Sequence, residues 1–156
     1  MKPLLVTDPA IPLRFLLGVV AGVLATLFMD IVMARLPEGD APPFVASGVL
    51  TATPPRSAPG RLAGTVHYLA GWLTGPLFVW LLFATEAIAG GPSILTTLLA
   101  AAVLYLLMVG FFVAVVLPRS RAPPSRVDLI RRDWALSAAA YLLVLVPLVA
   151  LGSRLL

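Results

Sequence analysis

Asp30 and His67 are the two ionisable side chains whose positions could support chemistry inside a membrane. Asp30 lies near the end of the first hydrophobic segment, and His67, the single histidine of the chain, lies near the start of the second. A carboxylate within a membrane span costs roughly 2.5 to 3.5 kcal/mol on insertion scales, so it usually faces a partner or a water-filled cavity. Because histidine changes charge near neutral pH, this pair could relay protons.

The same two residues also have a structural interpretation. Asp30 could be anchored by His67, or by the nearby Arg35 and Arg61. It would then fix how two helices align, as buried polar groups can do. The sequence leaves both interpretations open.

Neither a haem nor a metal site is expected from these residues. His67 could be an axial haem ligand with Met29 or Met33 as the second ligand, but one histidine cannot supply both axial histidines of a b-type site. Methionine in a helix usually serves packing. A metal site needs more protein ligands than Asp30 and His67 provide. We therefore predict no metal and no cofactor.

No known catalytic motif accompanies the pair. The chain has no cysteine, which excludes disulfides, thiol catalysis, Cys-ligated zinc and iron–sulfur clusters. It also lacks a nucleophile elbow, a phosphate-binding loop, an HExxH motif and a carboxylate-rich cluster. We therefore predict no catalytic residue.

Small side chains recur at every fourth position in the two segments that carry the pair. The stripe in the first segment is Gly18, Gly22, Thr26 and Asp30, and the stripe in the second is His67, Gly71 and Gly75. In a helix, residues four apart share one face, and small residues on that face let two membrane helices pack closely. The spacing predicts an antiparallel helix hairpin packed backbone to backbone.

The matched spacing also predicts which residues of the hairpin meet. The expected pairs are Asp30 with His67, Thr26 with Gly71, and Gly22 with Gly75. At a rise of 1.5 Å per residue, Asp30 and His67 would lie at equal depth, roughly 8 to 9 Å from their helix ends. Equal depth is what a side-chain pair requires.

The composition indicates an integral membrane protein. Hydrophobic residues make up 60% of the chain and charged residues 12%, and the mean hydropathy is +1.03. Soluble domains contain about 25% charged residues. The net charge of +4 could suggest nucleic-acid binding, but the arginines flank hydrophobic segments, where lipid headgroups explain them better. We expect no nucleic-acid partner.

The predicted fold is all-α: an up-down bundle of four transmembrane helices in one domain, residues 1–156. The expected spans are residues 13–36, 62–89, 93–117 and 133–154, with loops at 37–61 and 118–132. The first segment is too long for the apolar region of a signal peptide, so we expect it to be retained. Residues 44–50 form an apolar patch too short to span, which should lie on the membrane surface or over the helix ends.

Charge predicts the orientation of the bundle. Eight of the eleven Lys and Arg residues lie in the two loops or at Arg35, and the turn after the second span has none. By the positive-inside rule, both loops face the cytoplasm and both termini face outward. The protein is therefore expected to be multi-pass in the cell membrane.

Several polar residues are expected at the membrane interface. The predicted headgroup contacts are Arg119, Arg121, Arg126, Arg131, Arg132 and Trp134. Asp128 and Asp133 are expected to join these arginines in an interfacial collar, with Ser125 and Asp128 capping the last helix. Glu86 is expected to be solvated at the outer end of the second span.

The first two spans resemble small four-helix membrane proteins of unknown function from bacteria and haloarchaea. The resemblance rests on the run Gly22-Val-Leu-Ala-Thr-Leu-Phe-Met-Asp30, on His67-x-x-x-Gly71 and on Gly75-Pro-Leu-Phe78. It covers about 50 residues. It implies four spans and no particular activity.

These features favour a non-catalytic accessory or structural subunit. Its expected partners are membrane lipids and other integral membrane subunits, for instance of a respiratory or other energy-transducing complex, or further copies of itself. One alternative is a small proton-linked transporter or channel that uses Asp30 and His67. Another is a membrane enzyme that acts on a lipid, although no acid cluster or metal site supports it.

Overall fold

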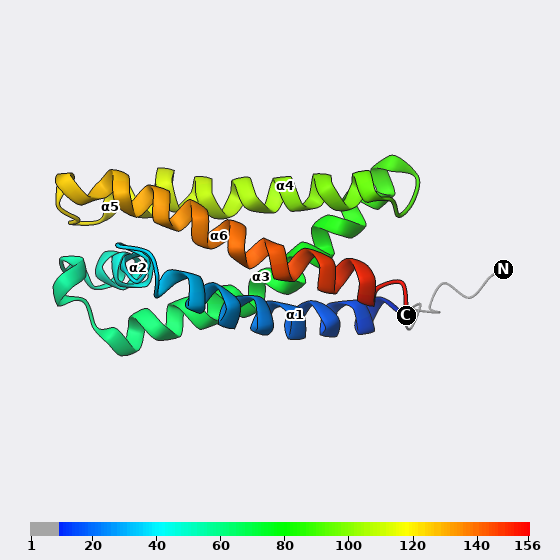
Figure 1. Ribbon diagram of the computed structural model, residues 1–156, viewed down its shortest axis with the longest axis horizontal. Coiled ribbons are helices and arrows are strands. Elements are labelled where there is room, and N and C mark those ends of the chain that lie inside the picture. The colour runs from blue at the N-terminus through cyan, green and yellow to red at the C-terminus, as the bar shows by residue number, and fades with distance from the viewer. Residues whose placement is uncertain (1–9) are drawn as a thin grey trace.

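The computed structural model describes residues 10–156, which form helices joined by connections at the two ends of the molecule (Figure 1). The helices are α1 (Ala10–Met33), α2 (Ala41–Thr51), α3 (Gly60–Ala89), α4 (Ile94–Phe111), α5 (Leu117–Arg119) and α6 (Pro124–Gly152). A 3₁₀ turn at Pro55–Ser57 precedes α3, and a π-helical turn at Phe112–Val116 joins α4 to α5. The described part of the chain contains no strand.

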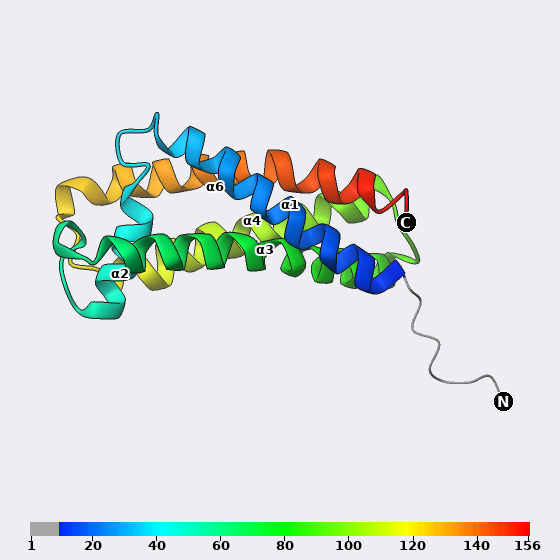
Figure 2. The ribbon, with the colours of Figure 1, turned by 90° about the horizontal axis from the view of Figure 1, so that it is seen from below.

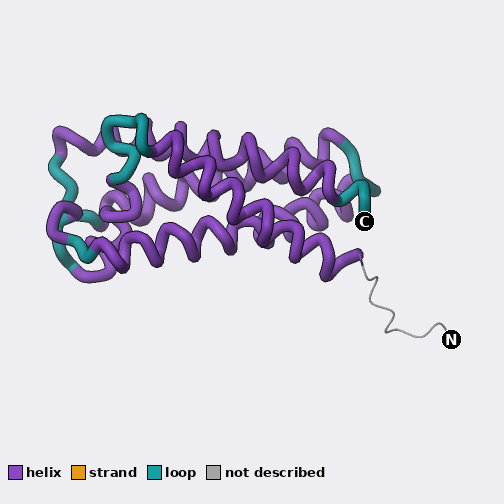
Figure 3. The backbone as a smooth tube through the Cα atoms, turned by 60° about the horizontal axis from the view of Figure 1, so that its bottom comes forward, coloured by secondary structure: helices purple, strands orange, loops and turns teal. Residues whose placement is uncertain are grey.

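Four helices between residues 10 and 156 are long and apolar enough to cross a membrane. They are α1, α3, α6 and the continuous helix Ile94–Arg119 that α4, the π-helical turn and α5 make together. The four run along the long axis, and the loops gather at its two ends (Figures 1 and 3). The predicted all-α class with four candidate spans is confirmed. Residues 1–9 lie outside the described part, and Lys2 with them.

Local sequence signals explain the turn between α3 and α4. Gly90 ends α3 with a φ of 83°, a left-handed conformation that glycine adopts without strain. The Ser93 side chain then accepts a hydrogen bond from the Thr96 N–H, while the Thr96 side chain accepts one from the Ser93 N–H. This capping box satisfies backbone donors that the first turn of α4 would otherwise leave free.

The helix bounds near the second loop differ from those predicted. The third span continues through Pro118 to Arg119, whereas the sequence suggested an end at residue 117. The fourth helix begins at Pro124, ahead of the span expected at residues 133–154, and proline is favourable in the first turn of a helix. Its N-cap is Pro123 without a side-chain hydrogen bond, so the predicted Ser125–Asp128 capping box is not formed.

The small-residue stripes bring the backbones of α1 and α3 together. A Cβ atom placed on Gly22 would lie 3.1 Å from the carbonyl oxygens of Gly71 and Trp72, and 3.3 Å from Cα of Gly75. Almost no room for a side chain therefore remains between the two helices at this point. Such close approach gives dense van der Waals packing, the main attraction between helices in lipid.

The same contact continues toward the termini. A Cβ atom on Gly18 would lie 2.8 Å from Cγ2 of Val79 and 3.0 Å from the carbonyl oxygen of Gly75. A Cβ atom on Gly75 would collide with the Gly18 carbonyl. The α1 and α3 helices thus cross with glycine on both sides of the contact, and Figure 2 shows α1 lying obliquely across the bundle.

Helix α6 completes the core on the other side of α1. Tyr141 is fully buried, and its hydroxyl donates a hydrogen bond to the Gly71 carbonyl of α3 at 2.6 Å. Leu145 and Val149 follow on the same face of α6 and are also fully buried. Gly71 packs against Thr26 of α1 where a side chain would otherwise lie, so one glycine contacts both α1 and α6.

Helix α2 covers the loop end of the bundle. Its Val45 is fully buried in a cluster with Phe112, Leu117 and Ile130. The apolar patch at residues 44–50 therefore lies over helix ends, which was one of its two predicted positions. Figure 1 shows α2 at the end of the molecule opposite the termini.

Replacing Gly75 by alanine should destabilise the bundle by about 1–3 kcal/mol, because the new methyl group forces α1 and α3 apart. Gly110→Ala is the matched control, since nothing lies within 4 Å of the position where its Cβ would be. Denaturation of the purified variants in detergent measures the difference. Equal loss of stability in the two variants would contradict the proposed close contact.

Candidate functional site

The structure brings Asp30 and His67 into direct contact. Nε2 of His67 lies 2.6 Å from Oδ1 of Asp30, and the side chains are 11% and 30% exposed, respectively. Tyr68 donates its hydroxyl to Oδ2 of Asp30 at 2.9 Å. Both carboxylate oxygens of Asp30 are thus engaged by α3, and the pair remains partly open to its surroundings.

The glycine contact determines where this pair forms. Thr26 packs directly against Gly71, and Asp30 and His67 lie one helical turn farther toward the loop end on their respective helices. The Thr26 hydroxyl donates to the Gly22 carbonyl of its own helix at 2.7 Å, so it adds no polar group to the interface. The register of the two stripes therefore aligns the carboxylate with the imidazole.

Tyr68 has a role that the sequence did not reveal. Its hydroxyl binds Asp30, and its ring packs edge-on against His67 with centroids 5.1 Å apart. The signal was adjacency to the histidine. The tyrosine side chain is long enough for its hydroxyl to reach the carboxylate that the neighbouring His67 also contacts.

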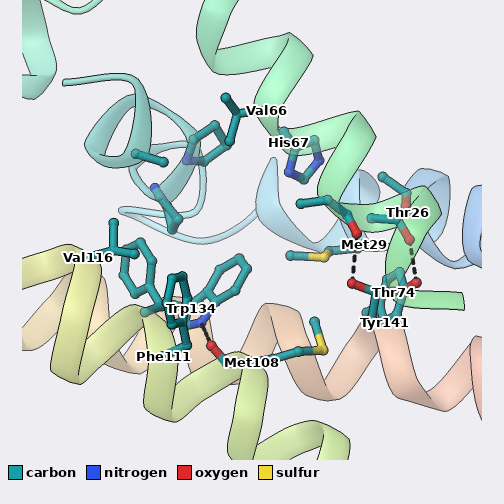
Figure 4. Close-up of a pocket in the computed structure, with 16 residues that line it drawn as sticks. Thr26, Met29, Val66, His67, Thr74, Met108, Phe111, Val116, Trp134 and Tyr141 are labelled. Carbon is teal, nitrogen blue, oxygen red and sulfur yellow. Dashed lines mark hydrogen bonds between the residues drawn. The ribbon is translucent and has the colours of Figure 1, made fainter. Parts of the chain in front are cut away.

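A cavity of about 230 Å³ adjoins the pair (Figure 4). We call it the α3–α4 cavity, because α3 and the end of α4 form its two long walls. Thr26 and Met29 of α1 and Trp134 and Tyr141 of α6 lie between these walls, and residues 42, 43 and 46 of α2 close one end. Figure 1 shows α3 and α4 close together where their connection joins them and diverging toward the end that holds α2, and residues of α2 line the cavity.

Most polar side-chain groups that line the α3–α4 cavity already have partners. The hydroxyls of Thr74 and Tyr141 donate to the carbonyls of Ala70 and Gly71 at 2.7 and 2.6 Å. The indole N–H of Trp134 donates to the Met108 carbonyl at 3.1 Å. The wall is therefore apolar in character, and His67 is the exception considered below.

Trp134 packs inside the bundle against the end of α4, and its contact with headgroups stays a prediction. It lines the cavity, its ring centroid is 5.0 Å from that of Phe112, and it is only partly exposed. Its indole therefore faces α4, where its N–H donates to the Met108 carbonyl.

A second polar cluster ties the first loop to α6. The fully buried Asp133 accepts hydrogen bonds from the Glu38 N–H at 2.7 Å and from Nε of Arg132 at 2.9 Å. The Glu38 carboxylate in turn accepts hydrogen bonds from Nε and Nη2 of Arg126. This arrangement satisfies a buried charge, as burial requires.

Asp133 pairs with Arg132, as expected for the collar, but its side chain is fully buried, which the prediction missed. The signal that could have revealed this burial is helical spacing, because Asp133 shares a face with the buried Ser137 and Tyr141. Its partner Glu38 comes from a loop, whose path the helical pattern does not encode.

Glu86 is also paired rather than solvated. Its carboxylate lies 3.3 Å from a guanidinium nitrogen of Arg14, and the two side chains are 14% and 18% exposed, respectively. The Arg14 guanidinium also lies over the Phe83 ring at 5.2 Å. This contact links the beginning of α1 to the end of α3.

The other arginines of the predicted headgroup set gather at the loop end. Arg119 donates to the Val115 carbonyl at 2.6 Å, Arg131 lies 3.3 Å from Asp128 in an exposed pair, and Arg121 is exposed. Their contact with headgroups stays a prediction. Within residues 10–156, no three His, Asp or Glu side chains come together as metal ligands.

Comparison of the chain with protein-family models, with curated proteins and with solved structures found no match. The resemblance to small four-helix membrane proteins therefore stays a prediction from the sequence. Function has to be argued from the bundle and its polar pairs.

Proposed function

We propose that the chain is a non-catalytic accessory or structural subunit of a larger assembly in the cell membrane. The observation that supports this is the use of its carboxylates. Asp30, Glu86 and Asp133, the carboxylates in the long helices other than Asp128, each contact a different segment of the chain. Groups that cost energy to place in a membrane thus hold segments together.

The proposed orientation places both loops in the cytoplasm and both termini outside. Figure 1 shows the loops that carry arginine at the end of the molecule opposite the C-terminus. Among the arginines of residues 10–156, only Arg14 and Arg154 lie at the opposite end, near the start of α1 and the end of α6. Arg35 and Arg119 donate to the carbonyls of Ile31 and Val115, where the helix dipole favours positive charge.

The outer faces of the spans leave room for partners. Only 17–33% of the most apolar window of each span is buried within the chain, and the lowest value belongs to Ile94–Arg119. The exposed residues on this span include Leu95, Leu98, Leu99, Leu106 and Leu107. Lipid or a neighbouring subunit would cover this surface in a membrane.

Isolation of the tagged chain from native membranes in a mild detergent tests the proposal. We expect larger membrane subunits, or further copies of the chain, to co-purify at a fixed stoichiometry that survives repeated chromatography. A lone, stable monomer that restores full biological activity to a strain lacking the chain would contradict it.

A proton-linked transporter or channel is the second candidate. The observation that favours it is that the Asp30–His67 pair is not sealed, because His67 lines the α3–α4 cavity. A relay would need this pair to exchange protons with both sides of the membrane.

Asp30→Asn in proteoliposomes separates the two proposals. If the pair is an anchor, the variant loses about 1.5–3 kcal/mol of stability, because a charge-assisted hydrogen bond is weakened, while proton flux stays at the background of empty liposomes. Asp128→Asn is the control, since the Asp128 side chain is 94% exposed. Flux that the unmodified chain supports and that Asp30→Asn abolishes at equal insertion would favour transport.

A further inference from the structure

His67 lines the α3–α4 cavity and carries one ring nitrogen without a hydrogen-bond partner among the described residues. Its Nε2 contacts Asp30, and no residue between 10 and 156 makes a hydrogen bond with Nδ1. Within the same residues, the one fully buried side-chain polar atom without a partner belongs to Ser153. Nδ1 of His67 is therefore not enclosed, and His67 is one of the cavity-lining residues drawn in Figure 4.

This nitrogen can either accept or donate a hydrogen bond. When the Nε2 proton is directed at Asp30, neutral His67 presents a lone pair on Nδ1; when His67 is protonated, Nδ1 presents an N–H. The first state matches a hydroxyl and the second matches a carbonyl. A ligand with either group could be held without rearranging the pair.

The charges around the cavity select a neutral ligand. No arginine or lysine lines it, and the carboxylate of Asp30 lies directly behind His67. An anionic headgroup at Nδ1 of neutral His67 would approach that carboxylate without a compensating cation. The ligand should therefore carry one neutral oxygen and otherwise apolar surface.

The cavity wall opposite His67 favours a ligand with a ring over a ligand with only an alkyl chain. Phe111, Phe112 and Trp134 present aromatic surfaces, and Phe112 and Trp134 pack against each other. The π-helical turn that begins at Phe112 contributes Val116 to the same wall, with the Leu117 N–H bonded to the Phe112 carbonyl. Such π-helical turns frequently lie at functional sites.

The size of the cavity limits how much of a lipid can enter. Its volume of about 230 Å³ is below the range of about 300–1,000 Å³ typical of pockets that enclose a whole ligand. A single ring fits this space better than a complete lipid. The remaining tail would lie outside the cavity along the bundle surface.

We propose that the α3–α4 cavity binds the ring of a neutral membrane lipid that carries a carbonyl or hydroxyl, with that oxygen hydrogen-bonded to Nδ1 of His67. The chemistry is that of a quinone or quinol with an apolar tail. This site goes beyond the accessory role, which does not require a ligand.

Fluorescence of Trp134 tests the site. The chain has three tryptophans, and Trp72 and Trp80 are exposed on α3, so the Trp72→Phe, Trp80→Phe background leaves Trp134 as the reporter beside the cavity. Titration of the full chain in detergent with a decyl-substituted benzoquinone should give saturable quenching. Decanol and decanoate should fail to displace the quinone at equal concentration.

Two variants assign the binding to the cavity. Ala70→Phe fills it and should abolish saturable quenching, whereas Ala102→Phe, on the exposed face of α4 outside the cavity, should leave it unchanged. His67→Gln keeps a donor for Asp30 but removes the ring nitrogen, and should weaken binding about tenfold, the loss of one hydrogen bond of roughly 1.4 kcal/mol.

Three results would overturn the proposal. One is quenching that rises linearly with quinone and is the same in Ala70→Phe. Another is displacement of the quinone by decanol or decanoate at equal concentration, seen as recovered Trp134 fluorescence. The third is unchanged quinone affinity in His67→Gln, because the proposed hydrogen bond to Nδ1 would then contribute nothing.

Discussion

The close contact between α1 and α3 is the constraint on which the rest of the structure depends. Glycine lies on both sides of the crossing, and the two backbones are so close that a Cβ atom on Gly75 would collide with the Gly18 carbonyl. Hydrophobic burial gives no preference for one helix pairing over another in lipid, and shape at the contact has to supply it. The contact sets the register of α3 on α1, aligns Asp30 with His67, and exposes the Gly71 carbonyl to Tyr141.

The polar pairs act at the two ends of this contact. Asp30 with His67 and Tyr68 lies toward the loops, and Arg14 with Glu86 lies toward the termini. Both pairs join α1 to α3, so the hairpin is held by glycine packing along its length and by charge near its ends. The buried Asp133 then joins the first loop to α6. This division of roles is why we favour a structural subunit over an enzyme.

Spacing made part of this arrangement predictable. Gly22, Thr26 and Asp30 recur with the period of a helix face, as do Gly71 and His67, and the structure brings the same residues together. Periodicity is informative here because both partners lie on regular helices. Hydropathy in the same way predicted the four candidate spans.

The rest depended on tertiary paths that no local pattern encodes. Asp133 is buried because Glu38, in a loop, donates its N–H to it. The α3–α4 cavity exists because α3 and α4 diverge, and the π-helical turn at Phe112–Val116 has no signature in hydropathy.

Disulfide trapping tests the central contact most directly, because the chain has no cysteine of its own. A Cβ on Gly71 would lie 3.2 Å from Cβ of Thr26, close to the separation of about 3.5–4.5 Å that a disulfide needs. The pair Thr26→Cys with Gly71→Cys should therefore form a bond in membranes upon mild oxidation, seen as loss of thiol alkylation by mass spectrometry. Thr26→Cys with Gly64→Cys, about 10 Å farther along α3, should not. Cross-linking of the Gly64 pair alone would contradict the register of α1 on α3.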